Sequence, residues 1–475
     1  MRLLLGESVS NFGTTVGKVA QLIPSQMRPL IFLFLAQNSF SQEQLTLDEA
    51  VSLAISKYPS IQVSTEQVSA ASASVALART AFLPRADFLL QANRATHNNV
   101  YGMLLPNAVI PPISGPVIDA SRFRNVFGTA AGVLVSWEPY DFGLRQAGVD
   151  AATASKRRAG LGLERTKFEV AAATADAYLT ILAARKNIDS ANAAIERTKQ
   201  LGTIVGALTK AELRPGADLS RVTAEQTVAE VFLYQARQSE QVARAALTQM
   251  TGRSMAQVDL VAAKFDQVPP DQAAPPVTAN HPALVEQEAA IEEVKALQFV
   301  LDRSLYPKLN AQAALFGRGT GASVVGPDQG WASGLGPNTG NWAMGFSMTW
   351  AALEFKTQRV KKEIEAASER KEIARRSLMA VEVNGAVDKA QAMIAGARQI
   401  AAITPQHVVA VKVTLEQVTA RYRAGLGTLL EVADAQRMLA QAEVDDAMAR
   451  LNVWRAQLSL AIAAGDLQPF LSLVK

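Results

Sequence analysis

The chain has 475 residues, no cysteine, three histidines and a formal net charge of +4. The absence of cysteine excludes disulfides, thiolate metal sites and a lipidated N-terminal cysteine. The small net charge, without a block of Lys or Arg, argues against a nucleic-acid partner. Hydrophobic residues make up 49% of the chain, and many of them are alanines, which favours close packing of helices over a bulky globular core.

The N-terminal segment, residues 1–41, is expected to be a leader with a cleaved export signal. A short apolar run at 30–36 follows Arg28 and precedes small residues at the spacing that a signal peptidase reads. The run is too short to span a bilayer, and no later stretch is long and apolar enough to do so. Met27 is a candidate for the true start. The alternative is a disordered leader with a chance apolar cluster.

Landmarks in the first half of the chain recur in the second half, in the same order and at near-equal spacing. The pairs are Pro59 and Pro84 with Pro282 and Pro307, Trp137 and Phe142 with Trp350 and Phe355, and Gly216 and Ala224 with Gly427 and Ala435. Such a recurrence predicts an internal duplication. We expect repeats at 42–253 and 280–465, a proline-rich linker at 254–279 and a C-terminal tail at 466–475. The first helix is predicted to follow Thr46, an N-cap candidate with Glu49 three residues on.

Each repeat contains a predicted strand pair, at 85–95 and 124–137 and at 308–316 and 341–350. The last strand alternates large apolar residues with small or polar ones. The large set is Trp342, Met344, Phe346, Met348 and Trp350. This pattern is typical of a membrane β-barrel strand, with the tryptophans near the two interfaces. An ordinary hairpin over a soluble core is the alternative. Four strands cannot close a barrel in lipid, so several chains would contribute, and three would give twelve strands.

The remainder is predicted to be long helix, at 142–208 and 216–252 and at 353–422 and 429–464. Pro405 is expected to kink the third of these helices. The returning helices carry mainly small residues at seven-residue spacing, which indicates antiparallel coiled coils. These residues are Val222, Ala229, Ala236, Ala243, Met250, Ala433, Ala440, Ala447, Trp454 and Ala461. The fold class is therefore mainly α with a small β part.

The turn between the last two long helices carries the sharpest site hypothesis. Gly425 and Gly427 supply the backbone freedom that a helical hairpin turn needs. Glu431 and Asp434 follow at a spacing that places both carboxylates on one face of the outgoing helix. The alternative is that they are solvated surface acids or partners of neighbouring arginines. No grouping of residues predicts a catalytic site, a metal site or a cofactor site, so an enzyme is not expected.

Five short motifs, taken together, resemble the TolC-like outer-membrane factors of Gram-negative bacteria. They lie at 45–50 with Tyr58 and Pro59, at 82–84, at 137–143, at 421–425 and at 430–436. The resemblance implies a homotrimer in which a twelve-stranded barrel in the outer membrane continues as an α-helical barrel across the periplasm. It implies an exit duct for drugs, toxic compounds or metal ions. A type I protein-secretion duct, and from another class a soluble helical scaffold, are the alternatives.

The resemblance also implies partners and sites. The periplasmic tip would dock onto an adaptor (membrane fusion) protein that serves an inner-membrane RND, MFS or ABC transporter, and the strands would face outer-membrane lipid. Glu431 and Asp434 match positions that line a constriction in the family, whereas their first-repeat counterparts, Ser220 and Thr223, are uncharged. The candidate adaptor contacts are Gly216, Ala217, Asp218, Gly425, Leu426, Gly427 and Thr428. Many relatives are lipoproteins, which a chain without cysteine cannot be.

Overall fold

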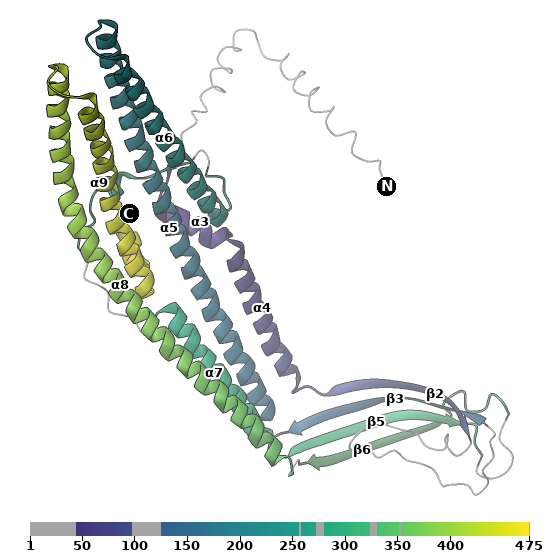
Figure 1. Ribbon diagram of the computed structural model, residues 1–475. Coiled ribbons are helices and arrows are strands. Elements are labelled where there is room, and N and C mark those ends of the chain that lie inside the picture. The colour runs from purple at the N-terminus through teal and green to yellow at the C-terminus, as the bar shows by residue number, and fades with distance from the viewer. Residues whose placement is uncertain are drawn as a thin grey trace, which may run out of the picture.

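The computed structural model describes residues 44–96, 125–255, 258–271, 280–323, 330–350 and 353–474. Within these residues the molecule is elongated, with long helices along most of its length and a sheet at one end (Figure 1). The expected leader, the loop inside the first strand pair and part of the expected linker lie outside the described residues.

The helices include two of more than 65 residues. They are α3 (Leu47–Lys57), α4 (Pro59–Thr80), α5 (Leu144–Lys210), α6 (Gly216–Thr251), α7 (Pro282–Arg303), α8 (Phe355–Arg423), α9 (Leu429–Ala464) and α10 (Gln468–Val474), with a 3-10 turn η2 (Ala263–Asp266). The strands are β1 (Gln44–Leu45), β2 (Arg85–Thr96), β3 (Asn125–Tyr140), β4 (Asp259–Leu260), β5 (Lys308–Thr320) and β6 (Thr339–Thr349).

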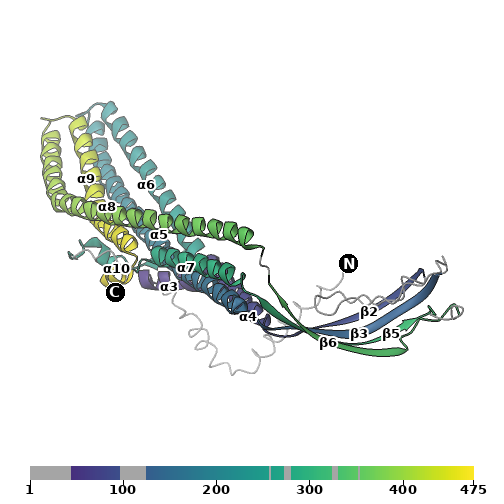
Figure 2. The same cartoon turned by 90° about the horizontal axis from the view of Figure 1, so that it is seen from below.

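The long helices form two antiparallel hairpins, α5 with α6 and α8 with α9, which lie side by side and point away from the sheet (Figure 1). Their small-residue seams are largely buried, including Ala236 in α6 and Ala433 in α9, as the heptad pattern predicts. Helix α8 is one uninterrupted helix across Pro405, and it bends along its length (Figure 2). A helix of 67 residues, such as α5, is about 100 Å long.

Helix α3 begins where the sequence predicts. The Thr46 hydroxyl accepts the backbone N–H of Glu49 at 3.3 Å, and the Thr46 N–H donates to Glu49 Oε2 at 2.9 Å. This reciprocal pair is a capping box, which satisfies two otherwise unpaired N–H groups. Pro59 then occupies the first turn of α4, where its missing N–H costs nothing.

The four long strands form one antiparallel sheet in the order β2-β3-β5-β6. Strand β3 ends at Tyr140, beyond the predicted 137, because the ladder resumes after an irregularity and pairs Tyr140 with Leu309. Strand β5 continues to Thr320, beyond the predicted 316, because it still pairs with β3 there. Strand β6 spans Thr339–Thr349 where 341–350 was predicted.

The two halves of the chain use the same hydrogen bond where sheet meets helix. Trp137 Nε1 donates to the carbonyl oxygen of Phe82 at 3.1 Å, and Trp350 Nε1 donates to that of Leu305 at 3.1 Å. Each bond joins the end of the second strand of a β-hairpin, β3 or β6, to the residue segment that precedes its first strand, β2 or β5. The indole N–H groups are thereby satisfied, and the apolar rings remain available for contacts on the sheet.

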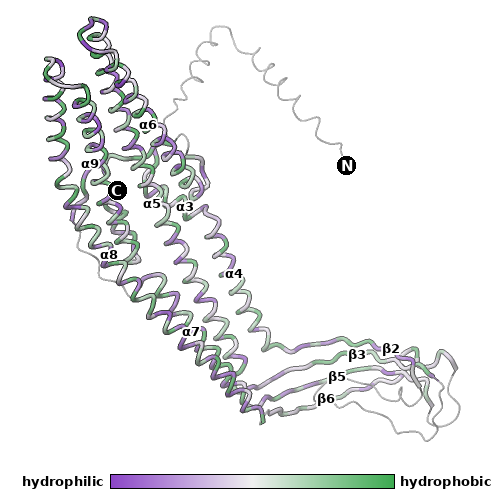
Figure 3. The backbone as a smooth tube through the Cα atoms, in the orientation of Figure 1, coloured by the Kyte–Doolittle hydropathy of each residue, from purple (hydrophilic) through white to green (hydrophobic). Residues whose placement is uncertain are grey.

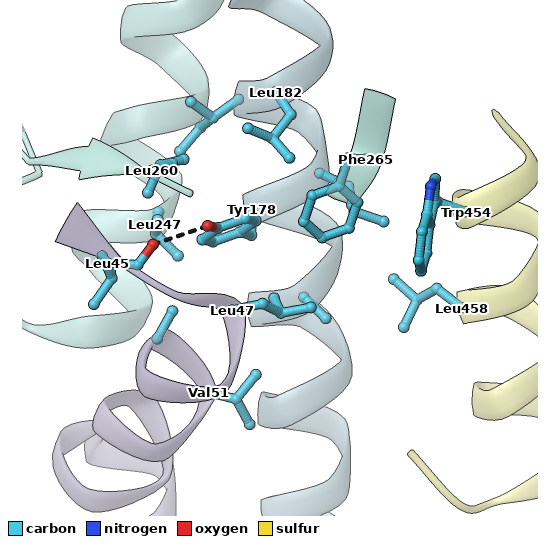
Figure 4. Close-up of a cluster of buried hydrophobic side chains, with 14 of the residues drawn as sticks. Leu45, Leu47, Val51, Tyr178, Leu182, Leu247, Leu260, Phe265, Trp454 and Leu458 are labelled. Atoms are coloured by element: carbon cyan, nitrogen blue, oxygen red, sulfur yellow. Dashed lines mark hydrogen bonds between the residues drawn. The ribbon is translucent and has the colours of Figure 1, made fainter. Parts of the chain in front are cut away.

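The main core packs the middle of α5 against the C-terminal parts of α6 and α9, and Figure 4 shows a part of it. The Tyr178 hydroxyl of α5 donates to the carbonyl oxygen of Leu45 in β1 at 2.8 Å, and Phe265 of η2 packs edge-on against Trp454 of α9 at 5.0 Å. The described part of the expected linker is therefore an ordered strap across both hairpins. The expected C-terminal tail contains α10, whose Phe470 and Leu471 are buried in the same core.

Candidate functional site

Both hairpin turns lie at the end of the molecule farthest from the sheet (Figure 1), where hydrogen bonds link them. In the second turn Gly425 has φ +77°, a left-handed conformation that glycine adopts without strain. A Cβ on Gly427 would lie 3.3 Å from the backbone nitrogen of Tyr422, so a side chain there would crowd the preceding turn. Both glycines therefore have a structural role in the turn. In the first turn Glu212 adopts φ +57°, and Pro215 precedes α6.

Tyr422, in the last turn of α8, connects the two turns. Its side chain is 1% exposed and packs with Leu429 and Val432 of α9 and with Val222 of α6. Its hydroxyl donates to Asp218 Oδ2 at 3.2 Å. Burial, and secondarily the negative charge of Asp218, raise the pKa of Tyr422, so the phenol stays protonated and can donate this bond.

Arg214 adds a second connection from the first turn to Tyr422. Its Nη2 donates to the carbonyl oxygen of Tyr422 at 2.9 Å, and its guanidinium lies 4.6 Å from the centre of the Tyr422 ring. A cation over an aromatic ring is attracted by the negative face of the ring. The two hairpins of one chain are therefore fastened together at their tips by a buried tyrosine of the second hairpin and two polar partners, Arg214 and Asp218, from the first.

Glu431 and Asp434 lie in the first turns of α9, the helix that contributes Leu429 and Val432 to this cluster. The Thr428 hydroxyl accepts the backbone N–H of Glu431 at 3.4 Å and donates to Glu431 Oε1 at 3.2 Å, so Glu431 takes part in capping α9. Asp434 pairs with Arg437 at 2.7 Å. Both carboxylates remain substantially exposed, with side-chain exposures of 41% and 51%.

The acids therefore have local partners as well as access to solvent. Arg421 Nη1 lies 4.0 Å from Glu431 Oε2, and Arg437 also approaches Glu225 of α6 at 3.5 Å. Exposed pairs of this kind contribute little to stability, because water and salt screen them. Both carboxylates consequently remain accessible to solvent and to a ligand or a protein beside α9.

A groove of about 280 Å³ runs between the hairpins beyond the acids, with walls from α5, α6 and α9. Near it, Arg197 of α5 forms two parallel hydrogen bonds with Glu443 of α9, at 3.0 and 2.8 Å. Forked arginine–carboxylate pairs are geometrically specific. Tyr422, Arg214 and the Arg197–Glu443 pair were not predicted as site residues. Tyr422 and Arg214 lie in the turn segments that the sequence singles out, whereas no pattern indicates which residues they meet.

The residues expected to contact an adaptor are brought together at the tip. Gly216, Ala217 and Asp218 form the first turn of α6, and Gly425, Leu426, Gly427 and Thr428 form the turn before α9. Leu213 and Leu426 are 69% and 74% exposed, so each turn presents one leucine to solvent.

The sheet exposes large apolar side chains on all four strands, and Figure 3 shows hydrophobic residues along each strand. On β6 one face carries the expected residues Trp342, Met344, Phe346 and Met348, each at least 64% exposed, and Trp350 follows the strand with 63% exposure. The paired positions continue it with Leu315 of β5, Val133 and Val135 of β3, and Phe88 and Leu90 of β2. The opposite face is mixed, with Gln312 donating to Ser136 beside a small apolar cluster around Leu134.

No described helix has the length and apolar character that a membrane span requires. Among the same residues, no cluster of three or more His, Asp or Glu side chains could hold a metal ion.

The family model of outer membrane efflux proteins matches residues 50–253 and 276–466, most of the chain. A comparison with curated proteins found no match.

Three solved structures share the fold at low identity. The CmeC outer membrane channel of Campylobacter jejuni is 15% identical, with a TM-score of 0.70, and the match covers 88% of this chain and 85% of CmeC. The outer membrane protein VceC of Vibrio cholerae is 15% identical, with a TM-score of 0.69, and the match covers 88% of this chain and 96% of VceC. The MtrE outer membrane channel of Neisseria gonorrhoeae is 18% identical, with a TM-score of 0.68, and the match covers 88% of this chain and 89% of MtrE. All three are outer membrane proteins. Long hairpins at one end, an apolar sheet face at the other and the match over both halves lead to one conclusion: the chain belongs to the outer membrane efflux protein family.

Proposed function

We propose that this protein is the exit duct of a tripartite efflux system in the outer membrane of a Gram-negative bacterium. Three copies would each supply four strands to a twelve-stranded barrel and two helical hairpins to a tube across the periplasm. Small molecules would pass through it without any chemistry on the way. The observation that carries the proposal is the exposed apolar face on all four strands at one end of helices about 100 Å long.

Closure of the barrel explains the sheet edges. In the order β2-β3-β5-β6, the described parts of β2 and β6 each pair on one side only. Lipid cannot satisfy the backbone groups of an open edge, so β6 of one copy would pair with β2 of the next. The threefold symmetry that repeats this pairing would place the hairpins of three chains around one axis.

The tip supports a gate and a docking end. Glu431 and Asp434 of three chains would form two rings of carboxylates, which favour cations and oppose anions. The contacts of Tyr422 with Asp218 and Arg214 would hold the two hairpin tips of each chain together and so keep the end of the tube narrow. The tip turns, with exposed Leu213 and Leu426, would receive an adaptor protein that serves an inner-membrane transporter.

Fractionation and crosslinking test the proposal directly. The chain has no cysteine, so a variant with Gln91→Cys on β2 and Ser347→Cys on β6 carries only the introduced thiols. A bis-maleimide reagent should produce an outer-membrane ladder that stops at three chains, and a variant with Gln91→Cys alone should produce no trimer. Recovery of the protein in the soluble periplasmic fraction, or as a monomer, would contradict the duct.

A further inference from the structure

The apolar face of the sheet contains a trough along β5. Two cross-strand rows have a small residue in the middle and large residues on both sides: Trp137–Ala311–Phe346 and Val135–Ala313–Met344. The rows beyond them have leucine in the middle, Leu309 at one end and Leu315 at the other. Because alternate residues of a strand share a face, these four β5 positions lie in one line. The alanines form the floor of the trough, and the bulkier leucines lie one row beyond it in each direction.

The trough is a cavity of about 340 Å³ with apolar walls. Phe82 and Pro84, which precede β2, extend the wall beside Trp137. The Trp137 indole N–H is bound to the Phe82 carbonyl oxygen at 3.1 Å, so the ring presents only carbon atoms. Gln312 also borders the cavity, and its side-chain amide donates to Ser136. The site therefore offers dispersion contacts and almost no hydrogen-bonding group to a ligand.

We propose that this trough binds one acyl chain of a phospholipid from the periplasmic leaflet. The inference rests on the proposed function, in which this face of the sheet contacts lipid. The trough is continuous with that surface, and a flexible hydrocarbon chain is the bilayer component that fills an elongated apolar depression. The Trp137 row lies near the end of the strands that joins α4 and α5, which would be the periplasmic side. A phospholipid chain from that leaflet reaches it, whereas lipid from the outer leaflet would lie at the far end of the strands.

Quenching of tryptophan fluorescence by phospholipids with brominated acyl chains tests the site. The reporter protein keeps Trp137 and the buried Trp454, which is 3% exposed in the helical core and serves as an internal reference. Trp331, Trp342 and Trp350 are replaced by Phe. Titration of the detergent-purified trimer with the brominated phospholipid should quench Trp137 in a saturable manner, with a single lipid bound per chain. Ala313→Phe fills the trough and should remove the saturable component. Ala311→Leu provides a second filled trough if Ala313→Phe fails to fold.

Two controls separate the trough from the wider surface. Ala92→Phe adds the same ring to β2 away from the trough and should leave saturable quenching unchanged. A second reporter keeps Trp342 and Trp454 and replaces Trp137 by Phe. One result would overturn the acyl site and leave the duct intact. In that result Trp342 is quenched, and Trp137 is quenched without saturation and to the same extent with and without Ala313→Phe. Absence of quenching at both Trp137 and Trp342 would overturn the lipid-facing sheet, and with it the proposed function.

Discussion

The hydroxyl group of Tyr422 donates a hydrogen bond to Oδ2 of Asp218 at 3.2 Å, although 204 positions separate the two residues in the chain. The bond joins the last turn of α8 to the first turn of α6, and so joins the tips of the two helical hairpins. Tyr422 is almost completely buried and Asp218 is half-buried, so competing water reaches this bond mainly from the Asp218 side. The tip is therefore held by a specific contact, and its loss should loosen both hairpins at once.

Replacement of Tyr422 by Phe removes this bond and keeps the ring that packs against Leu429 and Val432. We expect a loss of about 0.5–1.5 kcal/mol in the free energy of unfolding, as for a typical intramolecular hydrogen bond. We also expect a larger single-channel conductance, because the hairpin tips separate more readily. Tyr234→Phe, at an exposed tyrosine of α6, is the matched control. Equal conductance for Tyr422→Phe and the parent would show that this bond does not hold the tip closed.

Local patterns predicted the elements of the fold. Heptads of small residues predicted α6 and α9, and strict alternation between Trp342 and Trp350 predicted β6, because side-chain periodicity follows from backbone geometry. Glycines at 425 and 427 predicted the second turn. The pairing of Tyr422 with Asp218, and of Arg197 with Glu443, could not be predicted, since a single sequence does not specify which distant residues meet. The ordered strap and α10 were missed because their segments are short and lack periodicity.

The orientation of the sheet can be tested by placing charge on one face or the other. Phe346→Arg puts a guanidinium on the exposed apolar face, where lipid contact should destabilise the inserted protein by up to about 4 kcal/mol. Ser347→Arg puts the same charge on the opposite face, one residue away, and should be tolerated. Heat-modifiable trimers in the outer-membrane fraction measure the outcome. Similar losses of trimer for both variants would argue against a lipid-facing side.

His281 should make the stability of the middle of the molecule depend on pH. Its Nδ1 accepts the backbone N–H of Ala283 at 3.2 Å and caps α7, which requires a neutral imidazole. Burial, together with the positive charge of Arg165, lowers the pKa of His281, while a hydrogen bond with the backbone of Ile462 opposes the change. A depressed pKa means that the contribution to stability is present above the ordinary value of about 6.5 and is lost as the pH falls through the lower folded value.

The midpoint temperature of unfolding should therefore change more between pH 7.5 and pH 5 for the parent than for His281→Asn, because asparagine caps a helix and does not titrate in this range. His407→Asn, at an exposed histidine of α8, should retain the parental pH dependence. Identical pH dependence in the parent and in His281→Asn would exclude His281 as its source.

In the proposed duct, Glu431 and Asp434 line the narrow end, and planar-bilayer recording measures both conduction and the effect of these two charges. The double variant Glu431→Gln, Asp434→Asn removes both charges and keeps side-chain size and the capping capacity of residue 431. The control is Ser220→Ala, Thr223→Ala at the equivalent first-repeat positions. We expect the parent to form discrete, cation-preferring channels, the double variant to conduct more and prefer cations less, and the control to match the parent. No channels from the purified trimer would contradict the duct, and unchanged conductance and selectivity in the double variant would contradict its constriction.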